Sequence, residues 1–218
     1  MKKNPANMTT ELVFILDRSG SMQGLEKDTI GGFNATIAKQ RHEPGRAVVS
    51  TVLFDDLQDV VHDRVALQRV SPLTHSQYQT RGRTALLDAI GRAIRHINRM
   101  QKIQAAGRPD KTIFVITTDG MENASYEFTL NQVRALIEKR QRKNGWEFLF
   151  LGANTDAIST AADMGIRADR ASNYTHDACG TALSYDAACM AVSRMRCDAP
   201  LAAEWKGKVE ADHATRGR

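Results

Sequence analysis

The sequence predicts an α/β protein with a doubly wound, mostly parallel sheet, one antiparallel edge strand and helices on both faces. Short apolar segments of strand length alternate with segments of helical periodicity along most of the chain. The segments 11–16 and 111–118 carry continuous apolar runs, which are typical of buried parallel strands. Two neighbouring β-branched segments, 46–54 and 59–65, flank an Asp-Asp turn and predict a hairpin, which supplies the antiparallel strand.

Apolar spacing and turn residues place the elements in order along the chain. Helices are expected where apolar side chains recur every three or four residues, and the clearest runs from Leu86 to Met100. Gly31-Gly32 weakens the first helix or lets another backbone approach it closely. Residues 66–83 lack periodicity, which indicates a long loop. The expected strands are 11–16, 46–54, 59–65, 111–118, 146–151 and 170–174, and the expected helices are 22–41, 86–100, 130–142, 181–195 and one capped by Thr155 that runs to Met164.

The chain of 218 residues is long enough for one well-buried domain, and two would be cramped. Residues 1–10 are polar and are expected to be flexible. Every expected helix and strand falls within 11–197, which predicts a single domain over that range. From Asp198 the chain is Ala-rich and charged without an apolar face, so we expect a disordered tail over 198–218.

Composition excludes several classes of function. Thirty basic and 25 acidic residues give a formal charge of +5, an excess too small to indicate nucleic-acid binding. The cysteines Cys179, Cys189 and Cys197 match no zinc spacing and are expected to be reduced thiols. The sequence contains no secretory signal pattern and no segment apolar enough to span a bilayer. We therefore expect a cytoplasmic protein without a membrane partner.

Polar residues with oxygen side chains stand at three strand or helix ends. Asp17, Ser19 and Ser21 directly follow the first apolar strand, Thr84 precedes the clearest helix, and Asp119 follows the strand 111–118. In open α/β sheets, ligands bind outside the carboxyl ends of the strands, so these side chains are expected to meet at one edge. Carboxylate and hydroxyl oxygens are the ligands that Mg²⁺ and Mn²⁺ prefer. The pattern predicts a divalent-cation site.

Each segment also has a simpler structural explanation. Asp17 to Ser21 can serve as an N-cap for the next helix, Thr84 can cap its own helix, and Asp119-Gly120 is a common turn dipeptide. Their joint occurrence in this order favours the metal site. Two carboxylates neutralise a dication, and the hydroxyls leave it a strong Lewis acid. Such a site keeps exchangeable waters, one of which a carboxylate can displace, so Asp and Glu are the natural partner ligands.

The motif Asp-x-Ser-x-Ser, followed by a Thr in a glycine-containing loop and an Asp after a central strand, resembles the metal-ion-dependent adhesion site of von Willebrand factor type A (vWA) domains. The segments 82–90, 117–120 and 145–154 are similar to those of stand-alone bacterial and phage members. The resemblance implies that Ser19, Ser21 and Thr84 ligate the ion directly and that Asp17 and Asp119 often act through water. It also implies a protein partner presenting Asp or Glu, such as an AAA+ ATPase or an operon-encoded complex of stress or phage origin.

Residues near the motif are candidates for contacts with a partner or with metal-bound water. Arg83 stands where vWA domains frequently have a small residue, and its guanidinium either reaches a partner carboxylate or points to solvent. Glu122 and Asn123 follow Asp119 and are candidates to hydrogen-bond metal waters. Asp88 is a candidate to brace the metal loop.

Other polar residues carry no predicted chemistry. The acidic segment 55–59 is expected to be a solvated turn. The histidines have no ligand spacing on a shared element, and we expect surface or helix positions for them. They are His42, His62, His75, His96, His176 and His213.

The sequence thus predicts a metal-dependent protein-binding module that is not an enzyme. Two alternatives remain open at this point. One is a structural assembly subunit of a phage or stress-related complex. The other is a Mg²⁺-dependent phosphohydrolase with Asp17 as nucleophile. Such enzymes carry Asp-x-Asp-x-Thr, whereas this chain has Ser19 at the second Asp position, and no evident general acid or base stands nearby.

Overall fold

A computed structural model describes residues 4–104, 107–153 and 156–216. Within these residues the strands form a six-stranded sheet in the order β3-β2-β1-β4-β5-β6. Among these strands, β2 and β3 pair antiparallel and every other neighbouring pair is parallel, which confirms the predicted fold class. The strands are β1 (Thr9–Asp17), β2 (Arg46–Phe54), β3 (Gln58–Ala66), β4 (Lys111–Thr118), β5 (Glu147–Gly152) and β6 (Ala171–Asn173).

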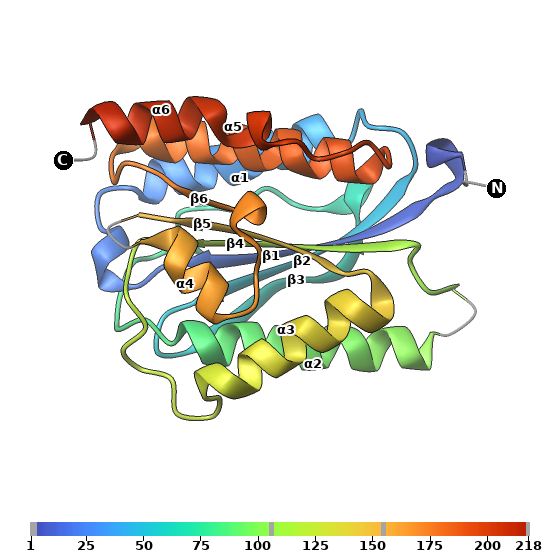
Figure 1. The fold of residues 1–218 in the computed structure, drawn as a ribbon, viewed down its shortest axis with the longest axis horizontal. Helices are drawn as coiled ribbons and strands as arrows, with labels where there is room; N and C mark the ends of the chain where they lie inside the picture. Colours follow the sequence, from blue (N-terminus) through green and yellow to red (C-terminus); the bar gives the residue numbers. More distant parts are fainter. Residues whose placement is uncertain (1–3, 105–106, 154–155, 217–218) are drawn as a thin grey trace.

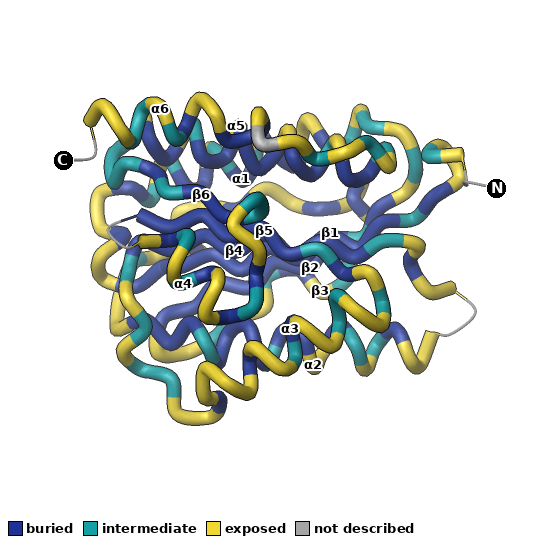
Figure 2. The backbone as a smooth tube through the Cα atoms, in the orientation of Figure 1, coloured by how far each residue is buried: buried dark blue, intermediate teal, exposed yellow. Residues whose placement is uncertain are grey.

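Helices cover both faces of the sheet (Figure 1). One face carries α1 (Glu26–Gln40), α5 (Ala178–Arg196) and α6 (Gly207–Arg216), and the other carries α2 (Leu86–Ile103), α3 (Leu130–Asn144) and α4 (Ala157–Asp163). The strands β1, β2, β4, β5 and β6 are mostly buried between these two layers, the edge strand β3 is partly exposed, and exposed residues gather on the outer sides of the helices (Figure 2). Thr155, the expected cap of α4, lies outside the described residues, and Asp156 occupies the N-cap position. In the described part of the chain, no helix has the length and apolar character to cross a membrane.

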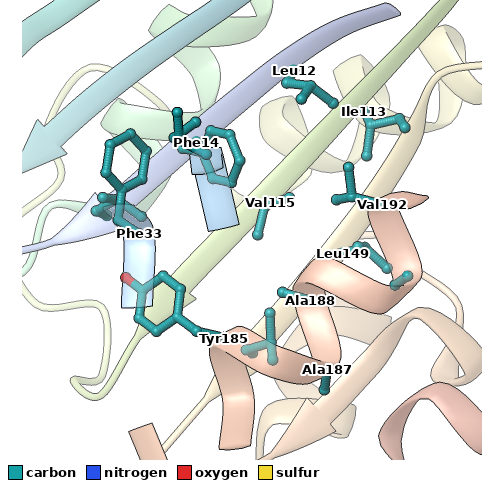
Figure 3. Packing of buried hydrophobic residues seen from close by; sticks show 14 of the residues in the cluster. Leu12, Phe14, Phe33, Ile113, Val115, Leu149, Tyr185, Ala187, Ala188 and Val192 are labelled. Atoms are coloured by element: carbon teal, nitrogen blue, oxygen red, sulfur yellow. The ribbon is translucent and has the colours of Figure 1, made fainter. Parts of the chain in front are cut away.

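The strand β1 contributes to two hydrophobic cores, one on each face of the sheet. Leu12 and Phe14 belong to the core under α1 and α5, and Val13 and Ile15 belong to the core under α2 and α3. Figure 3 shows Leu12 and Phe14 on the same side of the sheet as Phe33 of α1. Burial on both faces requires apolar side chains at successive positions, which is why the strand has a continuous apolar run in the sequence.

The sheet register brings the candidate ligands to one edge. Asp17 ends β1, and its neighbour Leu16 pairs with Thr117 of β4. Because the two strands are parallel and adjacent, Asp119, just beyond β4, follows the sheet at the same edge as Asp17. The loop that contains Thr84 leads into α2 beside this edge. Strand order and register thus place Asp17 and Asp119 at one edge, and hydrogen bonds of its loop bring Thr84 to them.

The ends of the chain differ from the sequence-based expectation. Residues 203–216 form the short 3-10 helix η6 (Ala203–Lys206) and then α6, where the sequence predicts a disordered tail. Trp205 and Val209 are 3% and 0% exposed and belong to the core next to α5. Two deeply buried side chains hold this segment, and they form no apolar stripe that periodicity can detect. At the other end, β1 begins at Thr9, so part of the segment expected to be flexible is a strand.

Two adjacent glycines in α1 have different surroundings. An added Cβ on Gly32 would lie 2.4–2.9 Å from three side-chain atoms of Tyr185 in α5. An added Cβ on Gly31 would have nothing within 4 Å. Close approach therefore requires a glycine at position 32 but not at position 31. The sequence alone left a weakened helix and a close approach as alternatives for this pair.

We expect Gly32→Ala to lower the free energy of unfolding by about 1–3 kcal/mol, because the methyl group overpacks the contact between α1 and α5. The matched control Gly31→Ala is expected to raise it by about 0.5–1 kcal/mol, because alanine favours the helix over glycine. Urea denaturation followed by circular dichroism measures both. Equal effects of the two substitutions would contradict this account of the packing.

Candidate metal centre

Three loops meet at the carboxyl ends of β1 and β4, and backbone hydrogen bonds tie them together. Gly20 in the loop after β1 donates its N–H to the carbonyl of Gly82 at 3.2 Å. Asn123 in the loop after β4 donates its N–H to the carbonyl of Thr84 at 3.0 Å. These bonds fix the loop that carries Thr84 between the other two. The segments are far apart in the sequence, and their meeting is a property of the fold.

Four of the five expected ligands form one cluster of oxygen atoms. The hydroxyls of Ser19 and Ser21 lie 3.0 Å apart, and the Ser21 hydroxyl donates to Asp119 Oδ1 at 2.7 Å. Thr84 joins this group through Gly120, where an added Cβ would lie 2.7 Å from Thr84 Oγ1 and 3.2 Å from Ser21 Oγ. The absence of a side chain at Gly120 leaves room for both hydroxyls. Ser21 is exposed, so the cluster is open to solvent on its side.

Asp17, the fifth residue, is buried directly beneath the serine loop. Its Oδ1 accepts the backbone N–H of Ser19 at 2.7 Å, and its Oδ2 accepts the hydroxyl of Thr118 at 2.5 Å. Burial raises the pKa of the Asp17 carboxyl from its ordinary value of 3.8 to about 6, although these hydrogen bonds act in the opposite direction. The charged form of this carboxyl therefore carries a desolvation cost, which a nearby cation would offset.

One carboxylate oxygen of Asp119, Oδ2, accepts no hydrogen bond, although His176 Nε2 lies 2.7 Å from it. Asp119 is 1% exposed, and its Oδ2 is buried without a hydrogen-bond partner. Among the described residues, neither Lys nor Arg forms an ion pair with Asp17 or Asp119. A buried carboxylate oxygen without a donor is costly unless a cation or water meets it. Three hydroxyls and two carboxylates, one of which has an oxygen that accepts no hydrogen bond, fit a hard divalent cation such as Mg²⁺ or Mn²⁺.

The site differs from metal centres built from charged side chains alone. Across residues 4–104, 107–153 and 156–216, no three His, Cys, Asp or Glu side chains gather in a way that could hold a metal ion. The candidate centre instead combines Asp carboxylates with the hydroxyls of Ser and Thr, which are not among those four residue types. Neutral hydroxyls balance less of the ion's charge than carboxylates would.

A required glycine shapes the loop before Thr84. Gly82 has a φ of 66°, in the left-handed region that favours glycine, and an added Cβ would lie 1.9 Å from Asp56 Oδ1. The next residue, Arg83, is exposed, and its backbone N–H donates to the same Asp56 oxygen at 3.4 Å. Arg83 therefore stands at the rim of the cluster. Its contact with a partner stays a prediction.

Glu122 and Asn123 lie beside the Thr84 loop and are engaged within the molecule. The Glu122 carboxylate accepts the backbone N–H groups of Leu87 at 2.8 Å and Ser125 at 2.7 Å. The Asn123 Oδ1 accepts the N–H of Thr84 at 3.0 Å. Both side chains thus hold the start of α2 against the loop after β4. Their predicted contacts with a partner or with metal-bound water remain predictions.

Asp88 in the first turn of α2 braces the same loop from below. It is 2% exposed, and its carboxylate accepts the backbone N–H groups of Tyr126, Glu127 and Phe128 at 3.1, 3.0 and 2.8 Å. Three donors on one carboxylate fix the path of the chain between β4 and α3. The bracing role expected for Asp88 therefore rests on these hydrogen bonds.

The acidic segment after β2 is the expected solvated turn only in part, because Asp56 and Asp59 are exposed and Asp55 is not. Asp55 is fully buried and accepts hydrogen bonds from Arg18 Nε at 2.9 Å and Arg81 Nε at 2.8 Å. Arg18 also forms an ion pair with Asp59 at 2.6 Å. Arg18 lies between Asp17 and Ser19, and Arg81 lies in the Thr84 loop. The buried Asp55 carboxylate therefore orders both loops that carry the hydroxyls, a contact that residue type alone could not reveal.

His176 is a further residue near the site whose place there the sequence did not indicate. It lies in the loop between β6 and α5, and its Nε2 is 2.7 Å from Asp119 Oδ2. Each of the two atoms is buried without a hydrogen-bond partner, so they face each other outside hydrogen-bonding geometry. The His176 side chain is 27% exposed, which leaves a path from solvent.

Comparison with solved structures defines the class of fold. The sequence matches no family model and no curated protein sequence. The PilB minor pilin from Streptococcus sanguinis has a TM-score of 0.61 at 11% identity, over 89% of this chain and 63% of that chain. Manganese-loaded TRAP protein from Plasmodium vivax has a TM-score of 0.57 at 13% identity, over 83% of this chain and 73% of that chain. A von Willebrand factor type A structure from Catenulispora acidiphila has a TM-score of 0.55 at 15% identity, over 88% of this chain and 42% of that chain.

These similarities show that the chain has a vWA-type fold, as the resemblance of its motifs implies. The chain spans less than two thirds of the pilin and less than half of the Catenulispora chain. At these identities the comparisons show the fold alone. The case for a metal centre therefore depends on the oxygen cluster of this chain itself.

We expect Asp88→Ala to lower the free energy of unfolding by about 2–3 kcal/mol, because it leaves three backbone N–H groups without their acceptor. Amide hydrogen exchange at Tyr126, Glu127 and Phe128 should accelerate by more than the global change accounts for. The control Glu138→Ala removes an exposed ion pair with Arg134 and should cost less than about 0.5 kcal/mol. Unchanged exchange at residues 126–128 in Asp88→Ala would contradict the bracing role.

Proposed function

We propose that this chain binds one divalent cation, Mg²⁺ or Mn²⁺, and uses it to bind a carboxylate of a protein partner. Ser19, Ser21 and Thr84 would ligate the ion, with Asp17 and Asp119 beside it. The observation that carries the proposal is the buried Asp119 Oδ2, which accepts no hydrogen bond and lies next to the converged hydroxyls. The manganese-loaded state of one protein of similar fold gives independent support.

The donor set explains why the partner group would be anionic. Two carboxylates balance the charge of a dication, and hydroxyls add oxygens without adding charge. The bound ion would supply Lewis acidity toward an incoming oxygen. The exposure of Ser21 allows a partner side chain to approach, and Arg83 stands exposed at the rim as a second positive group. A carboxylate of Asp or Glu satisfies both requirements.

We propose binding rather than catalysis. A phosphohydrolase mechanism would use Asp17 as nucleophile. Both Asp17 oxygens already accept hydrogen bonds, however, and the residue is fully buried. A phosphate ester could not reach either oxygen without breaking the loop. The cytoplasmic location expected from the sequence and the choice of partner complex stay parts of the proposal.

Titration calorimetry with Mn²⁺ and Mg²⁺ on the chelator-treated full chain tests the metal site. We expect one ion per chain and a rise in melting temperature, because the ion binds the folded state only. Asp119→Ala should weaken Mn²⁺ binding by about tenfold or more. The control Asp63→Asn, which alters an exposed carboxylate paired with His96, should bind as the unaltered chain does. Absence of binding to either ion would refute the proposal.

Affinity capture of proteins from the native host tests whether the chain binds a partner carboxylate. The unaltered chain and Asp119→Ala are compared, each first in Mn²⁺ and then in chelator. A partner that uses the metal should be retained by the unaltered chain in Mn²⁺, lost in chelator, which removes the ion, and lost or strongly reduced with Asp119→Ala, which weakens ion binding. Converting partner carboxylates to amides should also abolish retention. Full retention by Asp119→Ala would exclude carboxylate capture and favour an assembly role that does not use the metal.

A further inference from the structure

The loop between β6 and α5 is fixed on both sides of His176. On one side, the Tyr174 N–H donates to the carbonyl of Gly152 in β5 at 3.0 Å, and Tyr174 is 2% exposed. On the other side, Asp177 caps α5 by accepting the N–H of Gly180 at 2.7 Å. The backbone at position 176 is therefore held in place. The position of the imidazole beside Asp119 follows from the sheet and from the start of α5.

His176 Nε2 and Asp119 Oδ2 are two atoms that could ligate a cation. Within the described part of the chain, neither atom has a polar partner other than the other atom of this pair. They lie 2.7 Å apart, both are buried, and neither has a hydrogen-bond partner among the described residues. Neighbouring ligands of one octahedral ion lie about 3 Å apart at metal–ligand distances near 2.1 Å. The observed separation is close to that value. A simple ion pair between the two groups would instead be expected to adopt hydrogen-bonding geometry.

We propose that His176 Nε2 is a further ligand of the ion held at Ser19, Ser21 and Thr84, and that it directs the site toward first-row transition ions. This inference rests on the proposed metal site. A donor set of oxygens alone suits Mg²⁺ and Mn²⁺ about equally in ligand type, whereas an imidazole nitrogen favours the transition ion. The chain would therefore bind Mn²⁺ in preference to Mg²⁺, and Co²⁺ more tightly than Mn²⁺.

The chemistry of each neighbour is consistent with a nitrogen ligand at this place. Asp119 Oδ1 is already taken by the Ser21 hydroxyl, so only Oδ2 is free to face the ion or a metal-bound water. Both oxygens of Asp17 are likewise taken, by Ser19 and Thr118. The groups that remain to complete the set are thus the hydroxyls, Asp119 Oδ2 and His176 Nε2. A nitrogen supplies a strong neutral donor without adding a third negative charge.

Pulsed electron paramagnetic resonance on the Mn²⁺-loaded full chain reports a nitrogen ligand directly. We expect hyperfine coupling from an imidazole nitrogen in the unaltered chain and its loss in His176→Gln. The matched control His96→Gln alters the exposed imidazole that pairs with Asp63 and should keep the coupling. Calorimetry in parallel should give a Mn²⁺ to Mg²⁺ affinity ratio that falls by about tenfold or more in His176→Gln. Circular dichroism checks that each variant is folded.

The outcomes separate this inference from the proposal on which it rests. Mn²⁺ binding without nitrogen coupling in the unaltered chain would overturn the role of His176 and leave the metal site intact. Coupling that persists in His176→Gln, or an unchanged affinity ratio, would overturn it as well. Failure of the unaltered chain to bind Mn²⁺ or Mg²⁺ would overturn both. If the imidazole only pairs with the Asp119 carboxylate, the unaltered chain will bind Mn²⁺ without nitrogen coupling.

Discussion

The structure around the site depends on one constraint: two carboxylates, Asp17 and Asp119, are buried at the ends of neighbouring parallel strands. Their charges repel each other in a place where water cannot screen them, and the Asp119 charge is one of the causes that raise the pKa of Asp17. Hydrogen bonds to Asp17 offset part of this cost. Asp119 Oδ2 accepts no hydrogen bond that would offset the rest, and a dication is the natural complement.

The acidic residues around the sheet edge fall into two kinds. Asp55, Asp88 and Glu122 have carboxylates filled by Arg side chains or by backbone N–H groups. These residues hold the loops in place, and removal of a buried one leaves its donors unpaired. Asp119 Oδ2 accepts no hydrogen bond from the described part of the chain and faces only the imidazole of His176. This difference in hydrogen bonding, rather than residue type, separates bracing carboxylates from the one that faces a ligand.

The sequence could predict the sheet and the oxygen cluster because both depend on local patterns and one topological rule. Continuous apolar runs gave β1 and β4, and parallel strands must bring their carboxyl ends to the same edge, so Asp17 and Asp119 had to meet. Burial of Asp55 could not be predicted, because it depends on Arg18 and Arg81 reaching it from two other loops. The strand β6 falls within the expected strand 170–174, but no sequence pattern indicates that the loop after it brings His176 to Asp119.

The C-terminal helix shows how these unpredicted parts are connected. Arg216 of α6 forms an ion pair with Asp177, the residue after His176, at 2.6 Å. Asp212 of α6 accepts a hydrogen bond from the hydroxyl of Thr175, the residue before His176, at 3.2 Å. Both contacts are at least partly exposed, so they contribute little to global stability. Their effect is local: they hold the two neighbours of His176 against α6. A segment that sequence patterns assign to a tail therefore helps to fix the imidazole beside Asp119.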